Sequence, residues 1–177
     1  MTSVSRVRFL FSSAAIAAIG LPLLTKLADA AATIDPADLQ ALNSSIELEA
    51  ASMKVYNAAI ATQLLSDKTV ALASAFRDDH QAHLDALSGA VRASENTPSE
   101  QVAAIEYPAL RTENAILAFA RGIEEKAAST YLEIIPAFKN RDLAGIVASI
   151  LGIETTHVAL LAQVLGDFPA YTTGFVE

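Results

Sequence analysis

Three glutamates and three histidines occupy positions where an apolar helix would carry Leu, Ile or Val. The stretch SILGIETTHVALLAQVLG is an example, because Glu154 and His157 interrupt an otherwise apolar run. Residues three positions apart point to the same side of a helix, so these two side chains could bind one ion together. The complete set of such residues is Glu49, His80, His83, Glu124, Glu154 and His157.

These six residues are expected at one level of a helical core, where they need a counter-charge. A buried ionised carboxylate costs several kcal/mol unless it is paired. No Lys or Arg lies on the same apolar seams near this level. Bound metal is therefore our interpretation, and carboxylate and imidazole ligands suit iron, manganese or zinc. The alternative is a vestigial polar layer that fixes the register of the helices and holds water.

Four helical segments are predicted to position these side chains. The first begins after Asp35-Pro36, which reads as an N-cap followed by Pro at the first helical position. The second opens near Ser66-Asp67, and the fourth begins near residues 140–142 and ends at the C-cap Gly166. Apolar positions recur in steps of three and four, as in the seam of a bundle, over Leu39–Ile60, Ala73–Ala90, Leu117–Phe138 and Leu143–Val164.

The polar stretch SENTPSEQVAAIEYP separates the second helix from the third and is too long for a tight turn. We expect it to cross the bundle, with a short helix at Glu100–Ile105. The predicted fold is all-α: two antiparallel helical hairpins joined by a long crossing connection. A simple up-down bundle whose long loop does not cross is the alternative.

The two hairpins repeat each other in sequence. Leu42, Glu49 and Tyr56 recur 75 residues later as Leu117, Glu124 and Tyr131. Phe76, His80, His83 and Leu87 recur 74 residues later as Ile150, Glu154, His157 and Leu161. Such a repeat indicates two-fold pseudosymmetry, which would bring the six polar residues together at mid-bundle. Tyr56 and Tyr131 then have two interpretations: ordinary core aromatics, or residues that hydrogen-bond to metal ligands.

Composition excludes several classes of function. The chain has 177 residues, is 53% hydrophobic and contains no Cys, which rules out disulfides, thiolate metal sites and a thiol nucleophile. A net charge of -8 argues against binding to nucleic acid, which requires clustered Lys and Arg. The sequence shows no nucleophile–base constellation typical of a hydrolase.

The N-terminus reads as an export signal. Arg6 and Arg8 precede an apolar stretch, Phe9–Leu24, and Ala28-Asp29-Ala30 has the small-x-small form of a cleavage site. The predicted organisation is a signal peptide at 1–30, a helical bundle at 31–166 and an aromatic tail at 167–177, expected to lie along the bundle. The mature protein would be periplasmic or secreted, without stable membrane insertion; an uncleaved membrane anchor is the alternative. The motif SRVRFL resembles a degraded twin-arginine signal and leaves the export route open.

The chain resembles the ferritin-like superfamily of di-metal carboxylate proteins over about residues 35–166. More narrowly, it is similar to the exported bacterial ferritin-like domain family related to desiccation-associated proteins. The motifs that carry the resemblance are ALNSSIELEAASMKVY, DDHQAHLDAL, GIEEKAASTYLEIIP and IETTHVALL.

The resemblance implies ligand roles for the six residues. It places single, bridging-type glutamates at Glu49 and Glu124, one ligand pair at Glu154 and His157, and the other pair at His80 and His83. The family pattern has Glu where this chain has His80, which puts oxygen chemistry and the occupancy of one ion position in doubt. Asp79 is adjacent but would point about 100° away on a helix.

Two functions from different classes follow as expectations. The first is a ferroxidase, or an enzyme that reduces oxygen or peroxide in stress, with two divalent ions, of which iron is the first choice. The second is a non-catalytic bundle related to stress or desiccation, with a vestigial or structural metal site. The His80 substitution and the lack of a recognisable electron-transfer module favour the second. No cage interface is apparent, whereas Ala-x-x-x-Ala spacings are compatible with a homodimer.

Overall fold

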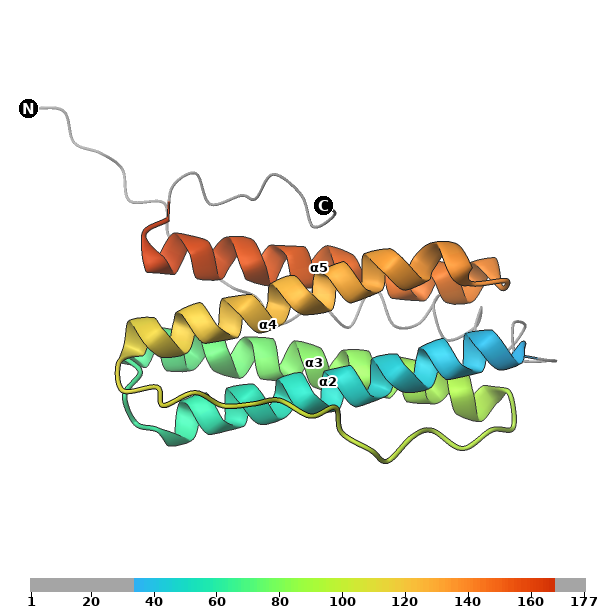
Figure 1. Cartoon of the computed structure of the whole chain (residues 1–177), viewed down its shortest axis with the longest axis horizontal. Helices are drawn as coiled ribbons and strands as arrows, with labels where there is room; N and C mark the ends of the chain where they lie inside the picture. The colour runs from blue at the N-terminus through green and yellow to red at the C-terminus, as the bar shows by residue number, and fades with distance from the viewer. Residues whose placement is uncertain (1–33, 168–177) are drawn as a thin grey trace, which may run out of the picture.

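The computed structural model describes residues 34–167 and has four long helices side by side (Figure 1). They are α2 (Pro36–Ala61), α3 (Asp67–Ala93), α4 (Glu113–Ile134) and α5 (Arg141–Leu165), with a short 3-10 turn, η2 (Ile135–Ala137), after α4. No strand occurs within this range, so the predicted all-α class is confirmed. The predicted signal peptide and residues 168–177 of the predicted tail lie outside the described residues.

Local capping sets the helix ends where the sequence predicted them. The Asp35 carboxylate accepts a hydrogen bond from the backbone N–H of Ala37, directly before Pro36. Asn140 caps α5 by accepting from the backbone N–H groups of Asp142 and Leu143. Gly166 ends α5 in the left-handed conformation (φ 83°), which only glycine adopts without cost.

The long connection crosses the bundle. Figure 1 shows it running back along α2, so that α4 begins beside the start of α3. The Glu113 carboxylate in the first turn of α4 accepts a 2.9 Å hydrogen bond from the backbone N–H of Ser66, the N-cap of α3. At the opposite end, buried Asp38 of α2 accepts from the backbone N–H groups of Lys139 and Asn140, just before α5. These contacts confirm the crossing topology over the simple up-down bundle.

The predicted short helix at Glu100–Ile105 was wrong, because this part of the connection is extended. The backbone N–H of Ala103 donates to the carbonyl of Glu47 on α2, and the backbone N–H of Ser99 donates to the Asn43 side chain. A helix of one or two turns is marginal by itself, and these contacts to α2 satisfy the backbone in the extended form instead.

Two predicted seam positions also differ from the structure. Phe138 is buried but lies outside α4, because Pro136 lacks the N–H needed to continue the helix, and the chain turns through η2. Val164 is 46% exposed, because it faces away from the core on α5, whereas the next residue, Leu165, packs against it. Apart from Met53, the other apolar seam residues lie in the hydrophobic core or pack against it.

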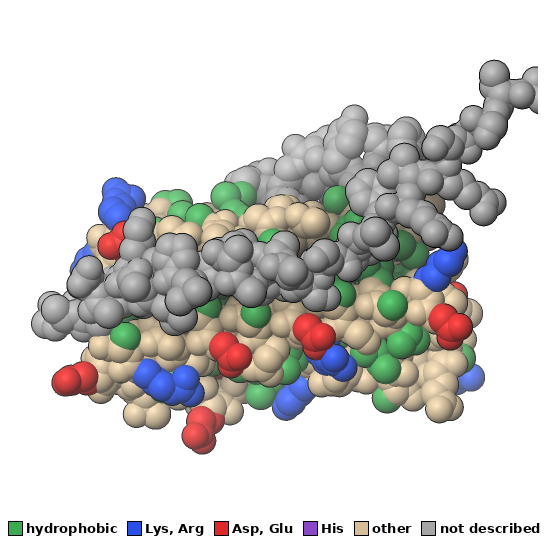
Figure 2. Space-filling model, turned by 180° about the vertical axis from the view of Figure 1, so that it is seen from behind, with side chains coloured by type: hydrophobic (Ala, Val, Ile, Leu, Met, Phe, Trp, Pro, Cys, Tyr) green, Lys and Arg blue, Asp and Glu red, His purple; other side chains and the backbone are tan. Residues whose placement is uncertain are grey.

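The core consists of two apolar clusters on either side of the polar level. One cluster includes Leu42, Leu87, Tyr131 and Ile150, and the other includes Tyr56, Phe76, Leu117 and Leu161. Among the described helices, α5 is long and apolar enough to cross a membrane by length and composition, a test that core helices also pass. The face seen in Figure 2 carries scattered charged side chains and no visible His.

Candidate metal centre

The structure brings all six predicted side chains into one buried layer between the two apolar clusters. Each long helix contributes: Glu49 from α2, His80 and His83 from α3, Glu124 from α4, and Glu154 and His157 from α5. His83 is the most exposed of the six, at 9%, while the other five are at most 2% exposed. The two hairpins therefore close around their polar residues as the sequence repeat predicted.

His80 lies at the centre of the layer, with a carboxylate near each ring nitrogen. Its Nδ1 is 2.7 Å from Glu49 Oε2, and its Nε2 is 3.2 Å from Glu124 Oε1. The same Nδ1 is 3.7 Å from Glu154 Oε1. The residue that departs from the family pattern thus links the carboxylates of both hairpins.

The other two histidines lie in opposite halves of the layer. His83 Nδ1 is 3.1 Å from Glu154 Oε1 and 3.4 Å from Glu49 Oε2. His157 Nδ1 is 3.4 Å from Glu124 Oε2. Each half of the layer therefore has one carboxylate and one imidazole of its own, with Glu154 and His80 between the halves.

Two overlapping groups of ligand atoms could each hold an ion, with the atoms of each group within 4.8 Å of one another. One group is Glu49, His80, His83 and Glu154, and the other is His80, Glu124, Glu154 and His157. Glu49 and Glu124, for which the resemblance implied bridging roles, each belong to one group. Glu154 belongs to both, because pseudosymmetry places positions 80 and 154 at the centre.

Buried polar atoms without hydrogen-bond partners indicate that this donor set could hold metal. They include His83 Nδ1, Glu124 Oε2, both carboxylate oxygens of Glu154 and His157 Nδ1. Leaving one such atom unsatisfied costs about 1–3 kcal/mol. All five belong to the layer, and all are lone-pair donors when the imidazoles are neutral and the carboxylates ionised. A divalent cation would satisfy them together.

The pKa values of the three carboxylates are shifted in different directions. Burial by itself raises the pKa of Glu49, but the hydrogen bond with His80 and the contact with His83 outweigh it and lower the pKa to about 2. Burial likewise opposes ionisation of Glu124, yet contacts with His157 and His80 lower its pKa well below the usual value. Burial and the charges of Glu124 and Glu49 instead raise the pKa of Glu154 well above its usual value.

The surroundings of His80 favour its protonated form. Burial lowers its pKa, but the hydrogen bond to Glu124 and the nearby carboxylates outweigh burial and raise the pKa well above the usual value. The forms of His80 and Glu154 that carry protons are therefore favoured beside the carboxylates of Glu49 and Glu124. An ion that enters must displace these protons.

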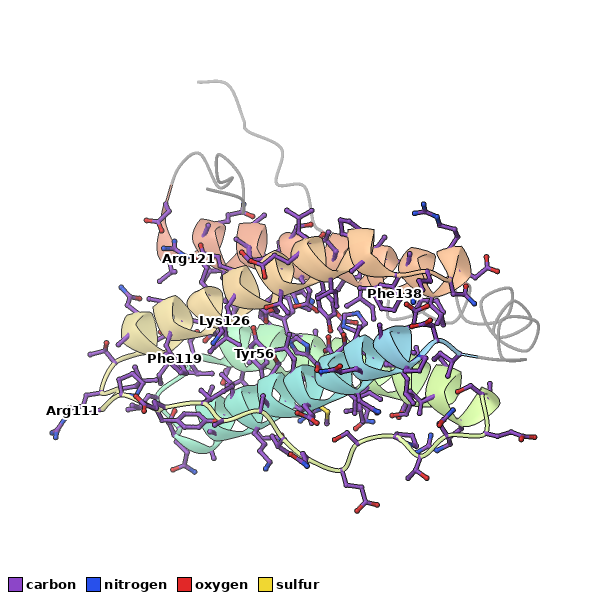
Figure 3. The ribbon with its side chains drawn as sticks, turned by 45° about the vertical axis from the view of Figure 1, so that its right-hand side comes forward. Tyr56, Arg111, Phe119, Arg121, Lys126 and Phe138 are labelled. Carbon is purple, nitrogen blue, oxygen red and sulfur yellow. The ribbon has the colours of Figure 1, made fainter. Side chains whose placement is uncertain are left out.

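Tyr56 and Tyr131 each hydrogen-bond to a carboxylate of the opposite hairpin. The Tyr56 hydroxyl donates to Glu124 Oε1, and the Tyr131 hydroxyl donates to Glu49 Oε1. Figure 3 shows Tyr56 inside the bundle. Burial raises the pKa of both phenols well above the usual value, so both remain donors. The charge of the neighbouring carboxylate acts in the same direction, that of Glu124 on Tyr56 and that of Glu49 on Tyr131. The sequence left two roles open for these tyrosines, core packing and hydrogen bonding to metal ligands. In the structure both rings are buried in the core and both hydroxyls hydrogen-bond to candidate ligands.

Asp79 is a contact that the sequence reasoning missed. His157 Nε2 donates to Asp79 Oδ2 at 3.2 Å, and the Phe76 ring stacks on His157 with ring centres 3.8 Å apart. Asp79 and His80 lie on different faces of α3, and the face with Asp79 is turned toward α5. The signal available in the sequence was the position of Asp79 immediately before the first histidine, in the motif DDHQAH.

The fold and this layer define an all-α four-helix bundle whose buried Glu and His groups could hold metal ions. The model of the ferritin-like domain family matches residues 37–167, and the chain belongs to this family. The link to desiccation-associated proteins stays a prediction.

Among solved structures, a conserved hypothetical protein from Mycobacterium tuberculosis has the same fold, with a TM-score of 0.66 and 18% sequence identity. The match covers 79% of this chain and 97% of that chain. At this identity the likeness concerns the fold alone. No curated protein matches the chain.

Proposed function

We propose that this protein binds two divalent ions, iron by preference, in the buried layer and acts as a ferroxidase or as a reductase of oxygen or peroxide in stress. The observation that carries the proposal is the pair of overlapping ligand groups, in which five buried atoms have no hydrogen-bond partner. The predicted export signal adds that this activity belongs to the periplasm or the cell exterior.

The ligands have distinct roles in this proposal. Glu49 and His83 would hold one ion, Glu124 and His157 would hold the other, and Glu154 and His80 belong to both ligand groups. Two Fe(II) ions bound there would supply the electrons for reduction of oxygen or peroxide. Tyr56 and Tyr131 orient the two outer carboxylates, and the apolar clusters on either side limit the access of water.

His80 sets the charge of the site. Three carboxylates and three neutral imidazoles carry -3 against +4 for two divalent ions, one negative charge fewer than with Glu at this position. The imidazole must also give up its proton before it can bind an ion. We therefore expect weaker binding than in a site with four carboxylates.

One observation favours a second function, a non-catalytic bundle for stress or desiccation with a structural or vestigial site. His80 already contacts carboxylates of both hairpins, so a protonated His80 acts as an internal counter-charge where an ion would otherwise be needed. In that case the layer would fix the register of the four helices without redox chemistry.

The rate of Fe(II) oxidation tests the first function against the second. The wild-type protein should show a saturable rate, and a Glu154→Ala/His157→Ala variant should lose it. Glu125→Ala is a matched control, because Glu125 neighbours Glu124 but lies on the partly exposed side of α4. Equal rates in the wild type and the double variant would support the non-catalytic bundle instead.

A further inference from the structure

The two halves of the metal layer differ beside their histidines, although the sequence repeat otherwise relates them. The offset of 74 residues that carries His80 to Glu154 and His83 to His157 carries Asp79 to Ile153. One half therefore has an acidic side chain at a position where the other half has an aliphatic one.

His157 is held on two sides. Asp79 accepts the hydrogen bond from Nε2, which leaves the lone pair of Nδ1 free to face Glu124 Oε2 at 3.4 Å. Phe76 stacks on the ring and restricts its rotation. The tautomer and the orientation of this imidazole are thus fixed before an ion arrives.

His83 lacks such support. Its Nδ1 faces the layer, but within residues 34–167 no side chain accepts a hydrogen bond from its Nε2. Its side chain is 11% exposed, compared with 2% for His157. Ile153, the counterpart of Asp79, has no hydrogen-bonding group and is itself 36% exposed.

We propose that the two ion positions are unequal: the position at Glu124 and His157 fills first and retains its ion, and the position at Glu49 and His83 exchanges its ion with solvent. Asp79 is the positioning residue that creates the difference. This inference rests on the proposed function, because it assumes that the layer binds two ions. Residues that support a metal-binding histidine typically change metal affinity about 10–100-fold, which sets the expected separation of the two binding steps.

The inference makes opposite predictions for two substitutions. Asp79→Asn removes the acidic partner of His157 and should weaken the tighter step by about 10–100-fold, so that the two steps converge. Ile153→Asp supplies the missing carboxylate beside His83 and should strengthen the weaker step. Asp78→Asn is the matched control, because it removes the same charge from the adjacent position, where the side chain is 66% exposed and pairs with Arg77.

The test is anaerobic titration of the purified protein with Co(II), followed by absorbance and calorimetry. A crystal loaded with one equivalent of Co(II) should show anomalous density beside His157 rather than His83. Circular dichroism and thermal unfolding of each metal-free variant establish that it folds, and Asp79→Glu should restore part of the separation between the steps.

The outcomes distinguish a failure of this inference from a failure of the proposed function on which it rests. Two equal binding steps in the wild type, first occupancy beside His83, or equal weakening of both steps by Asp79→Asn would overturn the inference while leaving a di-metal site. No Co(II) binding by the wild type and the Asp78→Asn control would overturn the di-metal site itself, and with it the inference.

Discussion

Tyr131 of the second hairpin donates a hydrogen bond to Glu49 of the first, although 82 residues separate them in the chain. Tyr56 of the first hairpin donates the corresponding hydrogen bond to Glu124 of the second. Each hairpin thus orients a carboxylate that belongs to the other. The contacts across the bundle therefore position the site and also join the two hairpins.

The phenol hydroxyls should contribute to stability even without metal. Tyr131→Phe leaves a buried carboxylate oxygen of Glu49 without its donor, and we expect a loss of about 1–3 kcal/mol in the free energy of unfolding. Urea denaturation of the metal-free protein measures it. Tyr107→Phe is the control, because Tyr107 is 49% exposed, and its effect should stay within about 0.5 kcal/mol. Equal stability of Tyr131→Phe and the wild type would contradict the role of this contact.

Metal binding should release protons and become tighter as the pH rises. The pKa values of Glu154 and His80 both lie well above their usual values, which favours the forms of these groups that carry protons. An ion must displace them, and a higher pH lowers the cost of doing so. Calorimetry in buffers of different ionisation enthalpy counts the protons released. An affinity independent of pH between 5 and about 8 would contradict this assignment.

Replacing His80 should have opposite effects on the metal-free and the metal-loaded protein. His80→Glu adds a buried carboxylate and removes the positive charge between Glu49 and Glu124. We expect the metal-free protein to lose about 3–5 kcal/mol of stability, as when one partner of a buried ion pair is removed. Metal should stabilise this variant more than it stabilises the wild type, because the ligand set regains the carboxylate of the family pattern.

Thermal unfolding with and without Mn(II) measures both effects of this replacement. His80→Gln serves as the comparison, since it removes the ring without adding a charge. A His80→Glu variant as stable without metal as the wild type would show that His80 does not act as a counter-charge.

The contact between the start of α2 and the start of α5 can be tested without disturbing the site. Asp38 is 1% exposed and accepts two backbone hydrogen bonds, from Lys139 and Asn140, each 2.9 Å long. Asp38→Ala should reduce stability by about 2–3 kcal/mol, because hydrogen bonds to a charged group are lost. Metal stoichiometry should not change. Asp85→Ala, at an exposed hydrogen bond within α3, is the control.

The sequence predicted the helices and the six layer residues because both depend on local spacing. Asp35, Asn140 and Gly166 are capping residues whose chemistry acts within one turn, and polar residues such as Glu124 and His80 interrupt the apolar seams visibly. The repeat between the hairpins then placed these residues at one level. Family membership of residues 37–167 agrees with that prediction.

The features that the sequence did not predict depend on how the helices rotate and where they end. Asp79 contacts His157 only because α3 presents this side to α5, and no periodicity within α3 encodes that. The connection is extended because Ala103 and Ser99 bond to α2, a long-range contact that outweighs local helix propensity. Val164 matches the apolar spacing but faces outward, while its neighbour Leu165 packs against the core.

The metal content of the purified protein tests the central claim most directly. Elemental analysis should find about two equivalents of iron or manganese per chain in the wild type, in accord with two overlapping ligand groups, and none retained in Glu154→Ala/His157→Ala. Absence of stoichiometric metal in the wild type, even after anaerobic loading with Fe(II), would contradict the claim. The buried layer would then be a polar level that fixes the register of the four helices.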